Sequence, residues 1–466
     1  MKISILTVFP ELYEPFLKTS LIGRARQKGI IETEIVSFFN FAQPKERIDS
    51  PSFGPGAGML LKPEIVQKAI EFQEQKHGKS FKIFFTPQGK KLNQKVLEDL
   101  KEKIEHKFSH LDSTATNLTA TTHSDPSTNS GLTAHESSSD FHLLLVASRY
   151  EGMDSRVEQF YADELISIGD FVLMGGDLPA MCFLEAFLRL IPGVVGKTES
   201  VEKESFSGPF LDYPEYTAPV VWNGMEVPEI VRSGNHALID KWRLEKAIIN
   251  TIQKHFDWLR SNELNRDQIK QVSKFLPAHY VALMHGDVVL KDNQSGTTSV
   301  TSLDIHDIAR SCATYGIKNY FICTPLEDQK KIVKTLLDFW QTGFGVEYNV
   351  HRHVAVNKVK LSNDVNAVVE EIKKIEGKEP IIIATSAKKD QFNQSKYITY
   401  NDQDKVWQHD APVLFLFGTG HGISKHILDR CDYILEPIYG FSDFNHLSVR
   451  SATAVILDRW LGINLK

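Results

Sequence analysis

Apolar residues along this chain of 466 residues occur in short runs that alternate with helical patterns. Between residue 1 and about 190, strand-like runs cover 3–8, 82–85 and 142–146, and helical periodicity covers 64–77 and 93–106. Buried strands separated by amphipathic helices are typical of an α/β fold. The pattern therefore predicts a mainly parallel sheet near the N-terminus.

The same alternation begins again near residue 276. Predicted strands cover 279–285, 319–324, 380–385 and 413–417, and predicted helices begin at Leu303 and cover 326–340. Between the two α/β regions, 197–275 is first acidic and rich in Gly and Pro and then helical from about Ala237. These changes divide the chain into 1–196, 197–275 and 276–466.

A low-complexity segment interrupts the first region. Of the 27 residues from 113 to 139, 14 are Ser or Thr, and the apolar periodicity is lost. Such a segment has too little apolar surface to offset the entropy of ordering. We expect a disordered surface insert between a helix and a strand, and its deletion should leave melting and activity nearly unchanged.

Composition and charge restrict the class of protein. With 42% hydrophobic and 24% charged residues the chain resembles an average soluble protein. No apolar stretch approaches the roughly 20 residues of a membrane span, and the first apolar run is too short for a signal peptide, so we expect a cytoplasmic protein without membrane contact. The net charge of −6 argues against bulk electrostatic binding of nucleic acid. Residues 235–274 nevertheless carry eight Lys or Arg against five Asp or Glu.

The cysteines indicate neither a metal site nor a disulfide framework. They are widely spaced and include no CxxC pair, so we interpret each as a small buried apolar residue in a reducing compartment. They are Cys182, Cys312, Cys323 and Cys431.

Three glycine-containing loops follow strands of the first region. They read FTPQGKK at 85–91, ASRYEGMD at 147–154 and SIGDFVLMGGDLPA at 167–180. Ligands of open α/β sheets bind at the carboxyl ends of strands, where glycine allows close approach of the backbone. Neither GxGxxG nor GxxxxGK[ST] is present, which disfavours a dinucleotide fold or a P-loop. The loops predict one shared pocket.

A longer series of motifs resembles a known family. FPELYEP, FGPGAGM, TPQGKKL, SRYEGMDSRV, SIGDFVLMGGDLPA, RLIPGVVG, LDYPEYTAP and NGMEVPEIVRSGNH occur in that order between residue 1 and about 275. This region resembles the bacterial tRNA (guanine-N1)-methyltransferases of the SPOUT class. The resemblance implies a trefoil-knotted α/β domain, a small helical tRNA-binding domain and a homodimer. It also implies methyl transfer from S-adenosylmethionine to N1 of the guanosine 3′ of the tRNA anticodon.

The cofactor residues follow from matching these motifs. Ser148 and the preceding Ala147 depart from the family, in which glycine is usual at the position of Ser148. The implied cofactor residues are Thr86, Pro87, Gln88, Ser148, Tyr150, Glu151, Gly152, Ile168, Gly169, Phe171, Leu173, Gly175, Gly176 and Pro179.

The reaction needs a proton acceptor, because guanine N1 carries a proton at neutral pH. The family uses an aspartate before a Ser-Phe pair, and Glu204 occupies that position here, with Asp212 or Glu202 as alternatives. Arg189 matches the family arginine that stabilises negative charge on guanine O6. The sequence is compatible with a Mg²⁺ ion that assists proton removal. It indicates no set of side chains that would bind a metal ion.

The resemblance also implies two sets of tRNA contacts. The guanine should lie against Asp49, the glycine loop and Arg156, although Ser50, Pro51 and Ser52 depart from the family's basic residue and proline. The helical part of 197–275, which begins at about Ala237 and is called the helical segment below, should contact the anticodon stem mainly through phosphates. The implied substrate residues are Asp49, Gly54, Gly56, Gly58, Arg156, His236, Lys241 and Arg243.

The third region resembles the cofactor half of SPOUT RNA methyltransferases, on the motifs GTGHGISKHI, CDYILEPIYG and NHLSVRSATAVILDRWLG. Asn445 and Arg450 are candidates for its chemistry, and a dimerisation or RNA-binding module without catalysis is the alternative. His351 and His353, on an expected strand, are interpreted as surface residues. A second methyl-donor pocket would be lined by Gly418, Gly420, Gly422, Ile438, Leu447, Ser448 and Val449.

Two other functions compete with a tRNA methyltransferase. A non-catalytic RNA-binding protein is suggested by Glu204, Ser148 and the altered segment after Asp49, whereas a small-molecule methyltransferase is disfavoured by the helical segment. Every motif of the tRNA reaction lies before residue 276, so the sequence also predicts that a chain ending near residue 275 stays dimeric and active.

Overall fold

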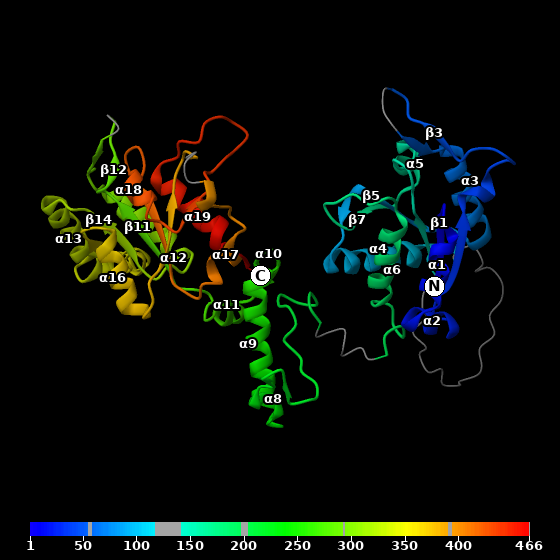
Figure 1. The fold of residues 1–466 in the computed structure, drawn as a ribbon, viewed down its shortest axis with the longest axis horizontal. Helices are drawn as coiled ribbons and strands as arrows, with labels where there is room; N and C mark the ends of the chain where they lie inside the picture. Colours follow the sequence, from blue (N-terminus) through cyan, green and yellow to red (C-terminus); the bar gives the residue numbers. More distant parts are fainter. Residues whose placement is uncertain (55–57, 117–140, 197–203, 292–293, 390–393, 466) are drawn as a thin grey trace. The chain divides into compact units, whose positions relative to one another are not determined.

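The computed structural model describes residues 1–54, 58–116, 141–196, 204–291, 294–389 and 394–465 (Figure 1). The chain divides into two compact units, 1–203 and 204–466. Each unit contains a parallel sheet with helices, as the alternation of apolar runs predicts.

The first unit is built on a five-stranded sheet in the order β2-β1-β6-β5-β7, in which every pair is parallel. Its strands are β1 Lys2–Thr7, β2 Glu32–Ser37, β5 Phe81–Lys91, β6 His142–Val146 and β7 Glu164–Ser167. Its helices are α1 Tyr13–Lys18, α2 Ser20–Gln27, α3 Pro63–His77, α4 Gln94–Thr116, α5 Ser155–Tyr161 and α6 Asp177–Leu188.

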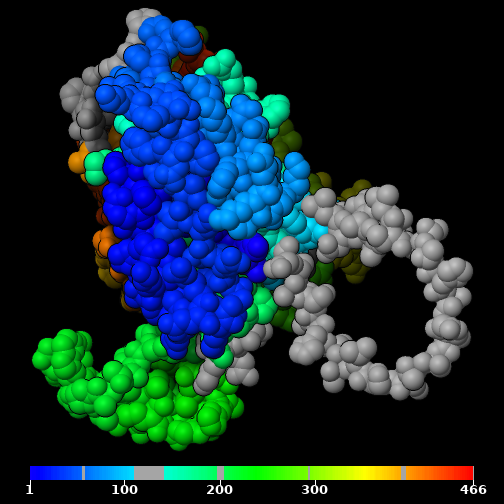
Figure 2. Space-filling model, turned by 90° about the vertical axis from the view of Figure 1, so that its right-hand side faces the viewer, coloured from blue at the N-terminus to red at the C-terminus, as the bar shows by residue number. Residues whose placement is uncertain are grey.

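Helices cover both faces of this sheet. Leu143 and Leu145 of β6 belong to one core with α1, α2, α4 and α6, and Leu144 and Val146 belong to the other core with α3 and α5. Successive side chains of a strand point to opposite faces, so a strand buried on both faces is apolar throughout. In Figure 2 the blue residues of this unit form one continuous packed surface.

The second unit begins with short elements and helices and continues into a seven-stranded sheet. The sheet order is β15-β14-β11-β18-β16-β19-β17, with all pairs parallel. Its strands are β11 His279–Met284, β14 Tyr320–Cys323, β15 Val359–Ser362, β16 Ile381–Thr385, β17 Tyr397–Ile398, β18 Val413–Gly418 and β19 Tyr433–Leu435.

The helices of the second unit fall into two groups along the chain. The first group is α8 Glu229–Arg232, α9 His236–Lys254, α10 Phe256–Ser261 and α11 Arg266–Val272. The second is α12 Ser302–Thr314, α13 Glu327–Gln341, α14 Gly345–Tyr348, α15 Val350–Val356, α16 Val365–Glu376, α17 Gln403–Trp407, α18 Lys425–Leu428 and α19 Val449–Leu461.

Among the described residues, four pairs of short strands lie outside the two large sheets. One is the hairpin of β3 Asp49–Pro51 and β4 Met59–Leu61 in the first unit. The second unit contains β8 Val221–Trp222 with β9 Met225–Glu226, β10 Glu263–Leu264 with β20 Asn464–Leu465, and β12 Val288–Val289 with β13 Ser295–Gly296.

The helices α9 to α11 share one core with the C-terminal sheet. Ile252 of α9, Phe256 of α10 and Val272 of α11 belong to the same buried cluster as Trp407 and Trp460. Phe256 packs edge-on against Trp407, with ring centroids 4.7 Å apart. The sequence boundary expected at residue 276 therefore lies within a continuous hydrophobic core.

Three local expectations need correction or extension. His351 and His353 lie on the helix α15, because the Asn349 side chain caps its first turn by accepting from the Arg352 amide at 2.9 Å. Cys182 is exposed on α6, whereas the other three cysteines are buried. Helix α4 continues four residues into the predicted insert, and 117–139 of the insert lies outside the described residues.

Candidate functional site

The three glycine loops of the first unit lie in the second half of β5 and directly after β6 and β7, and these strands are neighbours in the sheet. Because the strands are parallel, their carboxyl ends lie at the same edge. The predicted cofactor residues 86–88, 148–152 and 168–176 are therefore brought to one edge, with Pro179 buried on the following helix α6.

The loops after β6 and β7 are joined through their backbones. The Gly176 amide donates to the Ser148 carbonyl at 2.7 Å, and Arg149 and Gly175 form an isolated antiparallel bridge. A Cβ atom at Gly176 would lie 2.9 Å from the Ser148 amide nitrogen. This approach requires glycine at Gly176, whereas Ser148 contributes only backbone atoms to the contact.

The loop within β5 arises from a break in the pairing of this strand with β7. The register with β7 shifts between Phe85 and Lys90, so Thr86, Pro87 and Gln88 leave the ladder. Pro87 and Gln88 are exposed. An interruption of this kind redirects side chains at the end of a strand.

Apolar side chains surround these loops. Phe171 is 55% exposed, Leu173 36% and Tyr150 46%, and the latter has a positive φ of 62°. Gly169 is packed against Phe171, because a Cβ there would lie 2.3 Å from the Phe171 ring. Apolar groups combined with loop backbone suit a nucleoside that is recognised without charged side chains.

A buried carboxylate that the sequence analysis did not identify holds these loops. Asp177, with 1% of its side chain exposed, accepts from Arg149 Nε at 2.7 Å, from Tyr13 OH at 3.0 Å and from Thr7 Oγ1 at 2.5 Å. Burial, with the negative charge of Asp177 beside it, raises the pKa of Tyr13 well above its usual value. The sequence signal that could have identified Asp177 was the presence of an acidic residue directly after Gly175 and Gly176.

The predicted guanine-binding residues are near the loop that follows β6. Asp49 of β3 is 6% exposed and pairs with Arg47 through two hydrogen bonds of 3.0 and 2.9 Å, which lower the pKa of its carboxyl. Gly58 is packed against Glu151, because a Cβ there would lie 2.3 Å from Glu151 Cγ. Gly54 is exposed with a φ of 88°.

Of the remaining predicted residues, Arg156 lies on a helix and Arg189 directly follows one. Arg156 of α5 pairs with Asp154 at 2.6 and 2.9 Å, and this pairing lowers the pKa of the Asp154 carboxyl. Arg189 is the half-buried residue that follows α6. Gly56 and Glu202 lie outside the described residues.

Glu204 lies at the start of the second unit, in a turn packed on α10. The Ser207 amide donates to the Glu204 carbonyl at 3.2 Å. Phe206 contacts the rings of His255 and Trp258, with centroids 5.7 and 5.0 Å away. The backbone around Glu204 is therefore anchored to the helical segment, and the alternative base Asp212 is half-buried in the acidic segment that contains Glu204.

Helix α9 carries the predicted stem-binding residues. His236 and Lys241 are exposed, whereas Arg243 is half-buried, with its guanidinium 4.7 Å from the centroid of Tyr213. The Leu211 amide donates to Thr251 Oγ1 at 2.8 Å. The acidic segment thus packs along α9 and leaves His236 and Lys241 accessible.

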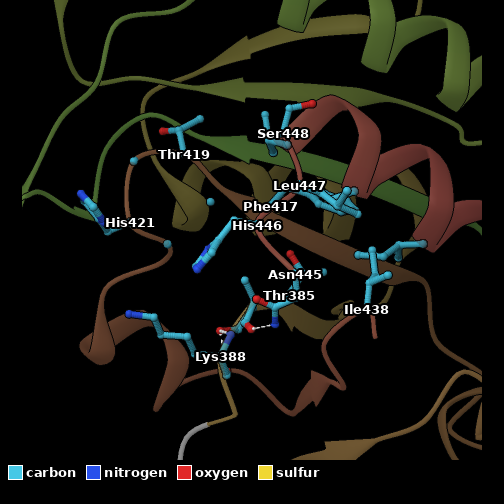
Figure 3. Close-up of a pocket in the computed structure, with 18 of the residues that line it drawn as sticks. Thr385, Lys388, Phe417, Thr419, His421, Ile438, Asn445, His446, Leu447 and Ser448 are labelled. Carbon is cyan, nitrogen blue, oxygen red and sulfur yellow. Dashed lines mark hydrogen bonds between the residues drawn. The ribbon is translucent and has the colours of Figure 1, made fainter. Parts of the chain in front are cut away.

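The second unit contains a cavity of ≈ 550 Å³ at the carboxyl ends of its strands (Figure 3). In Figure 3, Thr419, His421 and Lys388 border one side and Ile438 and Leu447 the other. The Asn445 side chain donates to the Ala387 carbonyl at 2.6 Å. The lining includes every residue predicted for a second donor pocket, namely Gly418, Gly420, Gly422, Ile438, Leu447, Ser448 and Val449.

Two residues were predicted to carry chemistry in this region. Asn445 lines the cavity, whereas Arg450 does not line it but contacts a lining residue. Arg450 pairs with Asp304, a lining residue, at 3.4 Å and with Asp307 at 3.6 Å. The lining of the cavity thus includes one glycine loop and the Asp304 carboxylate, which pairs with Arg450.

Comparison with protein families matches both regions of the chain. The family described as tRNA (guanine-1)-methyltransferase TrmD matches residues 1–108 and 104–261, and the family described as SAM-dependent RNA methyltransferase matches 278–462. The chain belongs to the tRNA (guanine-N1)-methyltransferase family.

Curated relatives agree with this assignment. A tRNA (guanine-N(1)-)-methyltransferase of Nitratidesulfovibrio vulgaris is 36% identical over 468 residues, which cover 99% of each chain. One of Oleidesulfovibrio alaskensis has the same identity and coverage. A relative of Carboxydothermus hydrogenoformans is 36% identical over 269 residues, which cover 58% of this chain and 91% of that protein.

Two kinds of feature are absent from the described residues of this tRNA (guanine-N1)-methyltransferase. No helix among the described residues is long and apolar enough to span a membrane. Nor do the described residues contain a group of three or more His, Cys, Asp or Glu arranged to hold a metal ion.

Proposed function

We propose that the first unit and the helical segment transfer a methyl group from S-adenosylmethionine to N1 of the guanosine 3′ of the tRNA anticodon. The convergence of three loops at the β5, β6 and β7 ends supports a single cofactor site there. The Gly175 and Gly176 contacts with the loop after β6 supply a rigid backbone surface. These loops would hold the adenosine moiety through backbone groups, with Phe171 and Leu173 excluding water.

The chemistry assigned to this chain is a proton transfer coupled to methyl transfer. The Glu204 carboxylate would accept the proton that leaves guanine N1 as N1 receives the methyl group. Arg189 would stabilise negative charge on guanine O6. Bound S-adenosylmethionine supplies the electrophilic methyl group. Assistance by Mg²⁺, the trefoil knot and a cytoplasmic location remain predictions.

The proposed functional state is a homodimer. Phe171, Val172, Leu173 and Met174 are 55%, 84%, 36% and 89% exposed, and Leu178 is 57% exposed beside them. A contiguous apolar patch on a soluble protein favours a protein interface. A second copy of the first unit would cover this patch.

The substitution Glu204→Gln tests the proposed function, because it removes the proton acceptor and preserves the shape of the side chain. We expect turnover to fall by at least about 100-fold with adenosylhomocysteine affinity unchanged. Methyl incorporation from labelled S-adenosylmethionine into a tRNA with guanosine 3′ of the anticodon measures this effect. Glu215→Gln, in the same segment, is the matched control, and near-normal turnover of Glu204→Gln would move the base to Asp212 or Glu202.

A second function is proposed for the C-terminal cavity, namely methylation of RNA. One observation favours an RNA acceptor: Tyr439, Phe441 and Phe444 are 57%, 115% and 72% exposed between the lining residues Ile438 and Asn445. Exposed aromatic rings provide stacking surfaces for unpaired bases. We expect a Glu204→Gln chain to retain methyl incorporation into total cellular RNA. The further change Gly420→Val should abolish it, because a Cβ there would lie 2.8 Å from the Val289 carbonyl oxygen.

A further inference from the structure

His285 follows β11 directly and lines the C-terminal cavity. Its side chain has an exposed fraction of 0%. Nδ1 lies 3.1 Å from Thr298 Oγ1. Nε2 is buried without a hydrogen-bond partner among the described residues.

The hydroxyl groups beside His285 determine which ring nitrogen carries the proton. Thr419 donates its hydroxyl proton to the Met284 carbonyl at 2.8 Å. Thr298 must therefore be the donor in its 2.5 Å hydrogen bond with Thr419. Thr298 then has only acceptor capacity left, so His285 donates from Nδ1 and Nε2 carries a lone pair.

The surroundings keep this imidazole neutral at neutral pH. Burial lowers the pKa of His285 to about 4, and the nearby Asp304 carboxylate opposes this shift only in part. The Asp304 oxygens are already engaged by Thr301 Oγ1 at 2.6 Å and by Arg450 at 3.4 Å. The wall of the cavity therefore contains a neutral, buried acceptor whose lone pair is unused.

A buried polar atom without a partner is unfavourable, and a ligand that supplies a donor removes this cost. A nucleoside offers such donors in its ribose hydroxyl and base amino groups. The chain of hydrogen bonds from the other ring nitrogen, Nδ1, connects His285 to Thr419 within the glycine loop, so the imidazole is held against the segment predicted to contact the nucleoside.

We propose that Nε2 of His285 accepts a hydrogen bond from a hydroxyl or amino group of a nucleoside bound in the C-terminal cavity. This inference rests on the proposed second function. The nucleoside is either that of the methyl donor or a nucleotide of the RNA acceptor, and both present the same donor chemistry.

Two substitutions separate the ligand contact from the structural contact with Thr298. In His285→Asn the amide N–H takes the position of Nδ1 and retains the donor to Thr298, whereas the acceptor at Nε2 is lost. In His285→Gln the longer side chain places its amide near the position of Nε2. A ligand contact predicts that Asn is the more damaging change, whereas a purely structural role predicts that Gln is.

Calorimetric titration of the full chain with adenosylhomocysteine provides the first arm. The wild type should bind two equivalents per chain. In His285→Asn one site should be unchanged and the other weakened by about tenfold or more, and in His285→Gln the second site should stay within about threefold of wild type. Thermal melting of both variants serves as the control for folding.

The second arm measures the KM for RNA in the Glu204→Gln chain. A tenfold rise caused by His285→Asn, with adenosylhomocysteine affinity unchanged, would support the proposal and place the donor on the RNA. Two wild-type equivalents with no effect of His285→Asn in either arm would overturn the inference and leave the second function standing. A single wild-type equivalent would overturn both.

Discussion

At the scale of single residues, the second unit contains a buried histidine with every hydrogen bond satisfied. His279 donates from Nδ1 to the Pro277 carbonyl at 2.7 Å, and its Nε2 accepts from the indoles of Trp407 and Trp460 at 3.3 and 3.2 Å. Protonation of Nε2 would place an N–H group against the two indole N–H donors and break both hydrogen bonds. Burial lowers the pKa of His279 to about 4, partly offset by the Pro277 carbonyl.

The His279 site predicts a loss of stability in acid. The pKa is about 4 in the folded chain and about 6.5 in the unfolded chain, so the unfolded chain binds more protons between these values. The contribution of His279 is complete above pH 6.5 and decreases as the pH falls to 4, by about 3 kcal/mol in total. Urea unfolding at pH 7.5, 6 and 5 should show a weaker pH dependence in His279→Gln than in wild type. Parallel curves would contradict this assignment.

The Asp177 carboxylate predicts an effect on both stability and cofactor binding. Asp177→Asn leaves the Arg149 guanidinium without its charged partner, and we expect the free energy of unfolding to fall by about 3 kcal/mol. The adenosylhomocysteine affinity of the first unit should fall as well, because Arg149 and Gly175 join the two loops. Tyr13→Phe is a milder control that removes one donor, expected to cost about 1–2 kcal/mol. Unchanged stability of Asp177→Asn would argue against a positioning role.

At the scale of elements, one arginine joins the helical segment to the last helix of the chain. Arg260 of α10 donates to the carbonyls of Asp458, Arg459 and Gly462 at 3.2, 2.7 and 2.8 Å. These carbonyls lie at the C-terminal end of α19, where the negative end of the helix dipole attracts a cation. The adjacent strands β10 and β20 pair in parallel.

Replacement of Arg260 should loosen this junction. We expect Arg260→Ala to lower the free energy of unfolding by about 2–3 kcal/mol, since three charge-assisted hydrogen bonds are lost. Hydrogen exchange should increase in α10 and at the end of α19, while α13 and α16 stay protected. Arg266→Ala, at the first residue of α11, is the matched control. Equal exchange in both variants would show that the junction does not depend on Arg260.

At the scale of the whole molecule, the second unit joins the helices α8 to α11 and an α/β domain in one core. The cluster that contains Ile248, Phe256 and Leu259 continues through Phe415 to Trp460. Apolar helix faces need a partner surface, and here the C-terminal sheet and α19 provide it. Because the two parts share this core, the structure argues against the expectation that the chain can be separated at residue 275.

Truncation at residue 275 should therefore disrupt the helical segment. We expect such a chain to lose helix content and to aggregate, because the buried faces of α9, α10 and α11 become exposed. A chain of residues 204–466 keeps this core complete and should stay folded and soluble. Circular dichroism and size-exclusion chromatography of the two chains make the comparison. A soluble chain of residues 1–275 with full tRNA methylation would restore the sequence-based expectation.

Some features of this protein were determined by the sequence alone. The apolar runs at 3–8 and 142–146 predicted β1 and β6, because strands buried on both faces must be apolar throughout. Motif order predicted the family, and the resemblance of the third region to SPOUT RNA methyltransferases predicted the lining of the C-terminal cavity, because close backbone approach leaves a local signature.

Other features were decided only by tertiary structure, because they depend on contacts between distant segments. The Asp177 cluster joins residues 164 and 170 positions apart, and the Arg260 contacts span about 200 positions. The alternating letters around His351 and His353 satisfy strand periodicity, but the Asn349 cap and the burial of the adjacent Ala355 and Val356 make a helix. The packing of the helical segment on the C-terminal sheet was also decided by tertiary structure. An apolar pattern shows that a helix face is buried, but it does not show which surface buries that face.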